Sequence, residues 1–320
     1  MEFLALKPEG KLRIAILGRT HWLLNAAKAI STRGHNIVFV ATASPAKEYL
    51  ANEQDFQQAA QRWGASFYSD IDINSEECIR AIESCKPDLA ISVNWPTLIL
   101  AATISACGRG ILNGHLGDLP RYRGNACPNW AILNGENRIG LAIHFMNHES
   151  IDSGPVVYRR YMDLDDNVYI EDVYNWLDTV NAESWCAALE NLVNPDFQPE
   201  EQEASDIRPL RCHPRRPSDG LIDWKLGAAE ICRLVRASSR PFEGAFSYIE
   251  GRERITIWRA SPVTLDYDVM AVPGQLMKDH NGSAIVICGD GFVRLDEVET
   301  TGDVKLLRSN KTRLLSPIEH

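Results

Sequence analysis

Short apolar runs alternate with segments of helical periodicity through the first half of the chain. The run Leu12 to Leu17 is typical of a buried strand, and it ends at Gly18. Residues 23–33 repeat their apolar positions every three to four residues and predict a helix. A further apolar run over residues 37–41 predicts the next strand. Because a strand, a helix and a second strand form a right-handed crossover, this opening predicts a parallel α/β sheet.

The same alternation continues as far as residue 170. It predicts further helices over 56–63 and 78–84 and further strands over 65–68, 89–93, 110–113, 141–146 and 156–162. From Ile170 the apolar residues share one helical face, which predicts a helix of about six turns. Asn194-Pro195 ends this helix, and the polar stretch 198–206 that follows is typical of a linker.

Beyond the linker the pattern changes to short strands separated by Gly and Asp turns. A helix is predicted over 228–238 and strands over 245–249, 255–260, 284–288 and 292–297. A length of 320 residues fits two domains. The sequence therefore predicts an α/β, Rossmann-like parallel-sheet domain over residues 1–205, followed by a small β-rich domain, an OB-like open barrel, over residues 206–320.

Composition is typical of a soluble cytoplasmic protein. Hydrophobic residues make up 45% of the chain and charged residues 24%, and no apolar run reaches the ~18 residues that a membrane helix needs. Residues 1–11 lack the apolar run of a secretory signal. The eight cysteines form no CxxC pair, which favours reduced cytosolic thiols over a disulfide framework or a zinc site. We therefore expect no bound metal.

The net charge of −10 is unevenly distributed. Residues 1–205 carry 16 Lys and Arg against 27 Asp and Glu, a balance of −11, whereas residues 206–320 carry 17 against 16. A protein that neutralises many tRNA phosphates usually has a more basic accessory domain. The charge therefore counts to a small degree against a tRNA substrate. Gly18 is followed by Arg19 to Trp22 without the glycines of a dinucleotide fingerprint, which disfavours a hydride-transfer enzyme.

Polar side chains that can carry chemistry occur where the predicted strands end. Asn113 and His115 are two residues apart at the end of a strand, so they project to the same side. The carboxyl ends of parallel strands are where open α/β sheets bind ligands. Asp152 precedes Ser-Gly-Pro. Taken singly, such a histidine is commonly structural and such an aspartate commonly forms a turn.

Three motifs together identify a family. Asn113-Gly114-His115 is followed by Leu119-Pro120 with Tyr122-Arg123-Gly124, and then by the motif Ile151 to Pro155. The segment that carries them resembles the folate-dependent formyltransferases, which include methionyl-tRNA formyltransferase, glycinamide ribonucleotide transformylase and the sugar-nucleotide N-formyltransferases. The resemblance implies 10-formyltetrahydrofolate as co-substrate. Many members have a serine two residues after the histidine, where this chain has Gly117.

The resemblance implies catalytic roles for Asn113, His115 and Asp152. The Asn113 amide can donate a hydrogen bond to the formyl oxygen as negative charge develops on it. His115 can supply a charge-assisted hydrogen bond or move a proton near neutral pH. Asp152 can hold an imidazolium, raise its pKa, or accept the proton of the amine directly or through water.

The resemblance also implies a folate pocket. One wall is Ser92, Val93, Asn94 and Trp95, where backbone groups would read the pterin edge; the alternative is a simple strand-to-helix connection. The other wall is implied to contain His144, Asn147 and Ile151.

The sequence determines the acceptor of the formyl group less well than it determines the other features. Asn129-Trp130, the block 216–224 and the segments 234–237 and 241–248 are similar to the enzyme that formylates UDP-4-amino-4-deoxyarabinose. A sugar nucleotide needs cationic groups for its pyrophosphate and an aromatic surface for its base. The substrate-binding residues that we expect are Tyr122, Arg123, Asn129, Trp130, Arg215 and Arg216. Single arginines and loop residues of this kind also have a structural interpretation, in local ion pairs or loop packing.

Three functions stay open. The favoured one is a sugar-nucleotide N-formyltransferase that makes a formamido sugar for lipopolysaccharide or another glycan, working as a homodimer by resemblance. The second is an enzyme with another acceptor, such as methionyl-tRNA or a hydroxylamino acid. The third is a folate- or nucleotide-binding module or a folate deformylase-like hydrolase.

Overall fold

The computed structural model describes residues 11–202, 207–249, 253–300 and 312–315. The chain forms two compact units that interleave along the sequence. The first unit contains residues 1–124, 138–162 and 175–212, and the second contains residues 125–137, 163–174 and 213–320. The division into domains at residue 205 stays a prediction.

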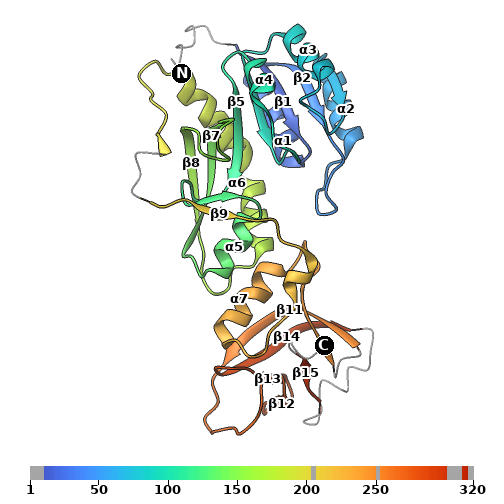
Figure 1. The fold of residues 1–320 in the computed structure, drawn as a ribbon, viewed down its shortest axis with the longest axis vertical. Helices are drawn as coiled ribbons and strands as arrows, with labels where there is room; N and C mark the ends of the chain where they lie inside the picture. Colours follow the sequence, from blue (N-terminus) through green and yellow to red (C-terminus); the bar gives the residue numbers. More distant parts are fainter. Residues whose placement is uncertain (1–10, 203–206, 250–252, 301–311, 316–320) are drawn as a thin grey trace. The chain divides into compact units, whose positions relative to one another are not determined.

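The first unit is built on a seven-stranded sheet with the strand order β3-β2-β1-β4-β5-β7-β8 (Figure 1). Its strands are β1 (Arg13–Gly18), β2 (Asn36–Thr42), β3 (Ser66–Ser69), β4 (Leu89–Val93), β5 (Ile111–Leu116), β7 (Arg138–Phe145) and β8 (Val156–Asp163). Neighbouring strands from β3 to β5 pair in parallel, which confirms the predicted parallel α/β sheet. β5 and β7 pair antiparallel, so the sheet is mixed beyond β5.

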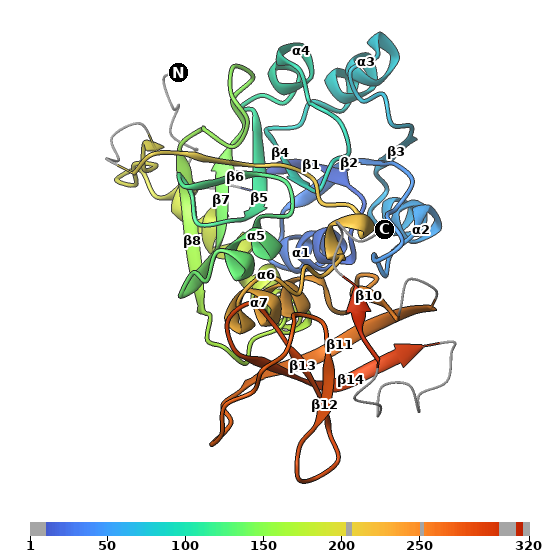
Figure 2. The same ribbon diagram turned by 60° about the horizontal axis from the view of Figure 1, so that its bottom comes forward.

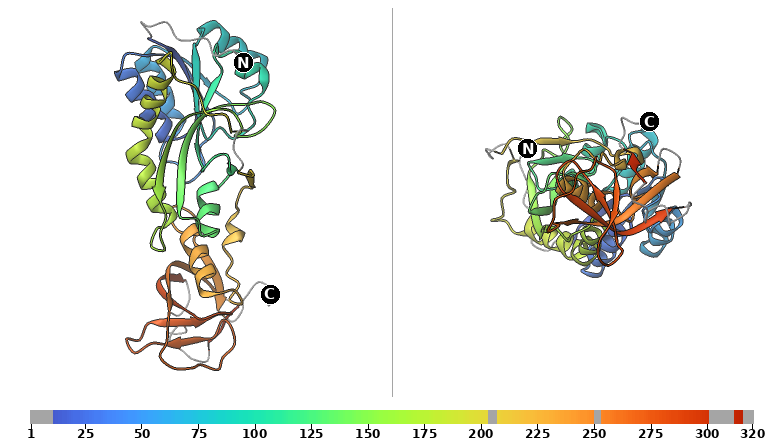
Figure 3. Two further views of the ribbon diagram at one scale, coloured as in Figure 1. Left: turned by 90° about the vertical axis from the view of Figure 1, so that its left-hand side faces the viewer. Right: turned by 90° about the horizontal axis from the view of Figure 1, so that it is seen from below.

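Helices cover both faces of this sheet. They are α1 (His21–Thr32), α2 (Glu53–Trp63), α3 (Glu76–Cys85), α4 (Ala101–Ser105) and the long helix α6 (Ile170–Val193). Apolar residues of α1, α2 and α6 pack together on one face, and those of α3 and α4 pack on the other. Figure 3 shows α6 extending alongside the sheet. The predicted six-turn helix is confirmed from its first residue.

The second unit has a six-stranded antiparallel sheet with the order β12-β13-β14-β11-β10-β15 (Figure 2). The strands are β10 (Ala245–Ile249), β11 (Glu253–Val263), β12 (Leu276–Lys278), β13 (Ala284–Ile287), β14 (Phe292–Thr300) and β15 (Leu314–Leu315). Helix α7 (Ala228–Ser238) packs on this sheet through Ile231, Cys232 and Val235. The unit also contains α5 (Cys127–Leu133) and the 3₁₀ helix η2 (Pro217–Gly220). The predicted β-rich fold of the C-terminal region is confirmed.

Four short strands have no counterpart in the sequence prediction: β12 and β15 of the six-stranded sheet, and β6 (Tyr122–Gly124) and β9 (Leu210–Cys212). β6 and β9 pair in parallel as a separate two-stranded sheet of the first unit. Each of the four has at most three residues, too few to show a period, so only the pairing reveals these strands. The predicted linker 198–206 contains Glu200, which forms a backbone bridge with Val156, while its residues 203–206 lie outside the described part.

Every cysteine is a free thiol, and all except Cys85 are buried. Burial raises the pKa of Cys78, Cys107 and Cys232 to about 12, so these thiols are protonated and unreactive at neutral pH. Within the described ranges, no helix is both long enough and apolar enough to cross a membrane.

Candidate active site

β5 carries the two polar side chains of the predicted site. The strand lies between β4 and β7, and its residues Ile111 and Leu112 are fully buried. Gly114 faces the side covered by α6, where a Cβ would lie only 2.8 Å from the indole of Trp185. Since side chains alternate along a strand, Asn113 and His115 project from the opposite side. Gly114 therefore lets the strand lie close to α6 while its two neighbours face the site.

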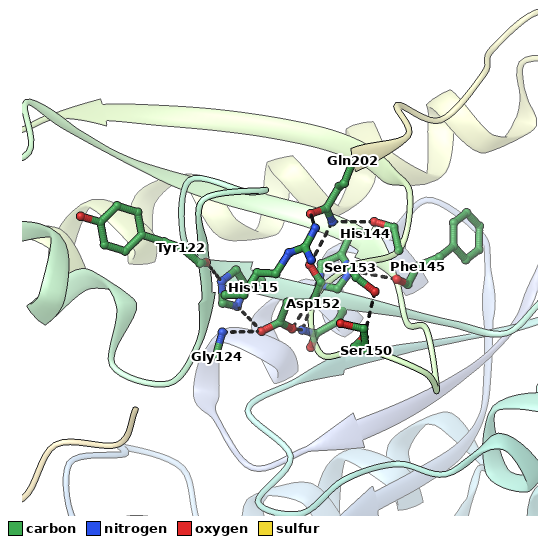
Figure 4. A network of polar contacts seen from close by, with 12 residues as sticks. His115, Tyr122, Gly124, His144, Phe145, Ser150, Asp152, Ser153 and Gln202 are labelled. Atoms are coloured by element: carbon green, nitrogen blue, oxygen red, sulfur yellow. Dashed lines mark hydrogen bonds and ion pairs between the residues drawn. The ribbon is translucent and has the colours of Figure 1, made fainter. Parts of the chain in front are cut away.

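Asp152 lies at the centre of the site, in the loop between β7 and β8. Its Oδ1 accepts a hydrogen bond from Asn113 Nδ2 at 3.3 Å, and its Oδ2 accepts one from the Gly124 amide at 2.8 Å. His115 Nδ1 lies 3.5 Å from Oδ2, and His144 Nε2 lies 3.5 Å from Oδ1. Figure 4 shows Asp152 beside His115, His144 and Gly124. The structure thus brings together the three side chains predicted to be catalytic.

The electrostatic surroundings of Asp152 keep it ionised. Burial by itself opposes the charge, but the imidazoles of His115 and His144 in their protonated form, together with the Gly124 amide, outweigh it and lower the pKa of the carboxyl well below its ordinary value. The side chain is only 11% exposed, so little water screens these interactions. A carboxylate of this kind can hold a proton acceptor beside it or stabilise a cation.

His115 is oriented by a backbone carbonyl. Because a carbonyl oxygen can only accept, His115 Nε2 donates to Tyr122 O, at 2.7 Å, and Nδ1 is left facing Asp152. Burial lowers the pKa of His115, and the opposing effect of Asp152 is smaller. We expected Asp152 to raise this pKa; it does act in that direction, but burial is the larger effect. The imidazole is therefore neutral at neutral pH and can accept a proton at Nδ1.

Gly117 explains how this orientation is possible. A Cβ at this position would overlap both His115 Nε2 and Tyr122 O. The space that a side chain at this position would need is thus occupied by the imidazole and its hydrogen bond to the carbonyl.

His144, which the sequence assigned to a wall of the folate pocket, lies beside the Asp152 carboxylate. It pairs directly with Asn113 across β5 and β7, and it is 1% exposed. Nδ1 donates to Phe145 O at 2.8 Å, which leaves Nε2 facing Asn113 Nδ2 at 3.3 Å and the Asp152 carboxylate. That His144 forms a wall of a folate pocket stays a prediction. The contacts seen in the structure are with Asn113, Phe145 and Asp152.

The residues predicted for the first pocket wall lie at the carboxyl end of β4. Ser92 and Val93 are buried in the strand, and the Ser92 hydroxyl has no hydrogen-bond partner within the described residues. Asn94 is exposed with φ 54°, and its side chain donates to Tyr49 Oη at 2.8 Å. Trp95 Nε1 donates to a threonine two residues ahead. Asn94 and Trp95 therefore have accessible surface for a ligand.

The second predicted wall is the loop that leads to Asp152. Asn147 is exposed, and its side chain accepts from the Glu149 amide at 2.9 Å. Ile151 is half-buried and directly precedes Asp152. Ser153 Oγ donates to Ser150 O at 2.9 Å and closes the turn (Figure 4).

The predicted substrate residues divide between the two units. In the first unit the Tyr122 ring is buried and its carbonyl contacts His115, while Arg123 Nη2 donates to Gln202 Oε1 at 2.8 Å. The remaining four lie in the second unit. Asn129 donates a hydrogen bond to the carbonyl of residue 237, and Trp130 donates one to the carbonyl of residue 213. The Arg215 guanidinium lies 5.4 Å from the Trp130 ring centre, and Arg216 is exposed.

Three contributors were missed by the sequence analysis. They are the Tyr122 carbonyl, the Gly124 amide and the side chain of Gln202, which donates to the carbonyls of Asp152 and Gly154. Backbone groups exist in every residue and give no signal in a sequence. Gln202 lies in the polar stretch 198–206, which is typical of a linker. In the described part of the chain there is no group of three or more His, Cys, Asp or Glu residues that could hold a metal ion.

Comparisons with known proteins agree with this arrangement. The model of the formyl transferase family matches residues 12–189, and that of the formyl transferase C-terminal domain matches residues 215–307. Methionyl-tRNA formyltransferase of Citrifermentans bemidjiense is 25% identical over 301 residues, which cover 92% of this chain and 91% of that protein.

Two solved structures are similar in fold. The N-formyltransferase of Helicobacter canadensis, in complex with folinic acid and dTDP-3-aminofucose, has a TM-score of 0.62 at 14% identity, covering 89% of this chain and 98% of its own. HypX of Aquifex aeolicus, in complex with tetrahydrofolic acid, has a TM-score of 0.60 at 19% identity, and the match covers 97% of this chain but 47% of HypX. With a family match that spans more than half of its residues, the chain belongs to the formyl transferase family.

Proposed function

We propose that this protein transfers the formyl group of 10-formyltetrahydrofolate to the amine of a nucleotide-linked amino sugar. The observation that carries the proposal is the ionised Asp152 carboxylate, held between the Asn113 amide and the His115 imidazole. The product is a formamido sugar for lipopolysaccharide or another glycan. A cytoplasmic location and a homodimer belong to the same proposal.

His115 and Asp152 supply the proton acceptor. The neutral amine attacks the formyl carbon, a new C–N bond forms, and the amine loses one proton. His115 Nδ1 takes up this proton, and the adjacent Asp152 carboxylate stabilises the imidazolium that results. As the bond between the formyl carbon and folate N10 breaks, the same proton returns to N10. The protons balance, and the site ends in its starting state.

Asn113 supplies the electrostatic stabilisation of the intermediate. Its Nδ2 group has two N–H bonds, and one of them is directed at Asp152 Oδ1. The other faces His144 Nε2 at 3.3 Å, and the formyl oxygen would replace this nitrogen as its acceptor when it becomes negative. Because the carboxylate holds the amide in place, the donor only exchanges one acceptor for another during the reaction, which makes such a hydrogen bond effective.

The folate is expected to lie along the carboxyl ends of β4 and β5. Asn94 and Trp95 present accessible surface there, next to the strand that carries Asn113. The complexes of the Helicobacter canadensis enzyme with folinic acid and of HypX with tetrahydrofolic acid support folate as the formyl donor.

Side chains of the second unit support a sugar nucleotide as the acceptor. Arg215 is positioned over the indole of Trp130, a cation and an aromatic surface suited to a pyrophosphate and a base. The dTDP-3-aminofucose in the Helicobacter canadensis structure is a ligand of this kind. Methionyl-tRNA is the second candidate acceptor, and the curated relatives that cover 92% of the chain at 25% identity favour it.

A mass-resolved assay separates these acceptors. The protein is incubated with 10-formyltetrahydrofolate and a panel of dTDP-, UDP- and GDP-linked 3-amino and 4-amino sugars, with initiator methionyl-tRNA in parallel. We expect one sugar nucleotide to gain the mass of a formyl group. Formylation of the tRNA alone would overturn the sugar acceptor but keep the chemistry. Binding of folate without transfer to any amine would contradict the transferase.

Gly117→Ser tests the orientation of His115. The serine side chain needs the space that the His115–Tyr122 hydrogen bond occupies, so we expect the ring to turn and kcat to fall by about 10-fold or more. Gly227→Ser is the control, because its side chain has room and would cap α7. If Gly117→Ser keeps the kcat of the wild type, the orientation seen here is not needed for turnover.

A further inference from the structure

The connection between the two family domains contributes to the site. Residues 190–214 lie outside both family matches. On either side of residues 203–206 this connection is attached to the first unit, through Glu200 and Gln202 before them and through β9 after them. Its contacts are with the backbone segments that carry Asp152 and that orient His115.

Gln202 uses its whole amide group in these contacts. Nε2 donates to Asp152 O at 3.0 Å and to Gly154 O at 2.7 Å, and Oε1 accepts from Arg123 Nη2 at 2.8 Å (Figure 4). The residue is 3% exposed. Burying a primary amide is costly unless its donors and acceptor are satisfied, and here all of them are. A buried amide with all of these hydrogen bonds is held in one conformation.

The chain before Gln202 is fixed by two further interactions. Glu200 exchanges two backbone hydrogen bonds of 2.8 Å with Val156, at the start of β8. Its carboxylate also pairs with Arg159, on the same strand, at 3.0 Å. Gln202 therefore approaches the Asp152 loop from an anchored backbone, which reduces the conformational entropy that its contacts must overcome.

The backbone that Gln202 holds is an unfavourable one. Asp152 has φ 52°, in the left-handed region that costs energy for a residue with a Cβ. This conformation is what directs the carboxylate towards Asn113, His115 and the Gly124 amide. The two carbonyls that accept from Gln202 belong to Asp152 itself and to the second residue after it. Arg123, the third partner, lies between Tyr122, whose carbonyl orients His115, and Gly124, whose amide binds Asp152.

We propose that Gln202 is a positioning residue for the Asp152 carboxylate, acting through the backbone of its loop. This inference rests on the proposed formyl transfer for its kinetic test. The hydrogen bonds of Gln202 are with the carbonyls of Asp152 and Gly154 and with Arg123, so it acts on the site through these groups. Its effect is to keep the loop in the conformation in which Asp152 contacts both the amide and the imidazole.

Gln202→Glu separates this role from a simple contact with Arg123. A glutamate has the same shape and pairs with Arg123 more strongly, but its oxygens cannot donate to the carbonyls of Asp152 and Gly154. If Gln202 positions Asp152, both Gln202→Glu and Gln202→Ala lower kcat, by about 10- to 100-fold, with a smaller change in KM. If Gln202→Glu turns over like the wild type, the residue acts only through Arg123 and the proposal is overturned.

A measurement without turnover keeps this test separate from the proposed function. The titration of His115 is followed by NMR, since the facing Asp152 carboxylate raises its pKa and a displaced carboxylate would raise it less. We expect the His115 titration to move to lower pH in Gln202→Ala, which adds no charge near the imidazole. An unchanged titration overturns the proposal, whether or not an acceptor has been found.

Matched variants complete the design. Gln198→Ala removes an exposed glutamine of the same connection and should leave kcat and the His115 titration unchanged. If Gln202→Glu folds poorly by circular dichroism, Gln202→Asn takes its place, because a shorter amide cannot reach both carbonyls and Arg123 at once. Full activity of a folded Gln202→Asn, with an unchanged titration, would likewise overturn the proposal.

Discussion

Asp152→Asn lowers kcat for formyl transfer by about 10³-fold, the largest effect that we expect from a single substitution. An asparagine carries no charge, so it cannot stabilise the imidazolium that forms when His115 takes up the proton. Its NH₂ group would also replace one of the two carboxylate oxygens and so face either the Asn113 or the Gly124 donor, which would lose its acceptor. The measurement is the steady-state rate with the acceptor found in the panel, together with the affinity for folate.

The same substitution changes stability in a pH-dependent way. Because the folded-state pKa of Asp152 lies below its ordinary value, the ionised form stabilises the folded protein at neutral pH. That contribution is lost as the pH falls through the folded-state pKa. The difference in Tm between the wild type and Asp152→Asn should therefore narrow on acidification.

Asp178→Asn is the matched control for Asp152→Asn. Asp178 also pairs with an imidazole, that of His21 at 2.8 Å, but away from the site. Its loss should leave kcat close to that of the wild type. An Asp152→Asn variant that stays within 10-fold of the wild-type kcat would refute the role given to this carboxylate.

His115→Ala is expected to lower kcat by about 10²- to 10³-fold and to change the pH profile. In the wild type the pKa of His115 is lowered by burial, so the neutral imidazole persists to more acidic pH than the ordinary value of about 6.5. Activity should therefore decline only below that value, as His115 becomes protonated. In His115→Ala the remaining activity should lack this decline.

The control for His115→Ala removes an exposed histidine of the second unit, His280. Rates measured between pH 5 and 8 on the three proteins compare the profiles directly. A profile of His115→Ala with the acidic decline of the wild type would assign that decline to another group and contradict the proposed proton acceptor.

The sequence was sufficient for the elements whose side chains repeat over several turns or strand residues. α6 begins where its apolar face begins, and β4, β10 and α7 have the predicted bounds. The three residues predicted to be catalytic lie together because β5 and the Asp152 loop meet as the motif implied. Long periodic segments predict well, since burial of one face determines them.

The contacts that depend on chain pairing could not be predicted. The position of His144 beside Asn113 requires the antiparallel register of β5 and β7, which no local pattern specifies. The ring orientation of His115 depends on the Tyr122 carbonyl and on the space at Gly117. Tertiary contacts between segments far apart in sequence determine each of these features.

The pairing of β6 with β9 defines where the protein can be divided. β9 ends at Cys212, although the family match to the first domain ends at residue 189. A fragment cut at the end of that match would lack the partner strand of residues 122–124, whose backbone contacts His115 and Asp152. A fragment that keeps this active-site backbone therefore extends at least through Cys212. Chimaeras that exchange acceptor specificity between relatives should be joined after this strand, so that each parent keeps its own active-site backbone.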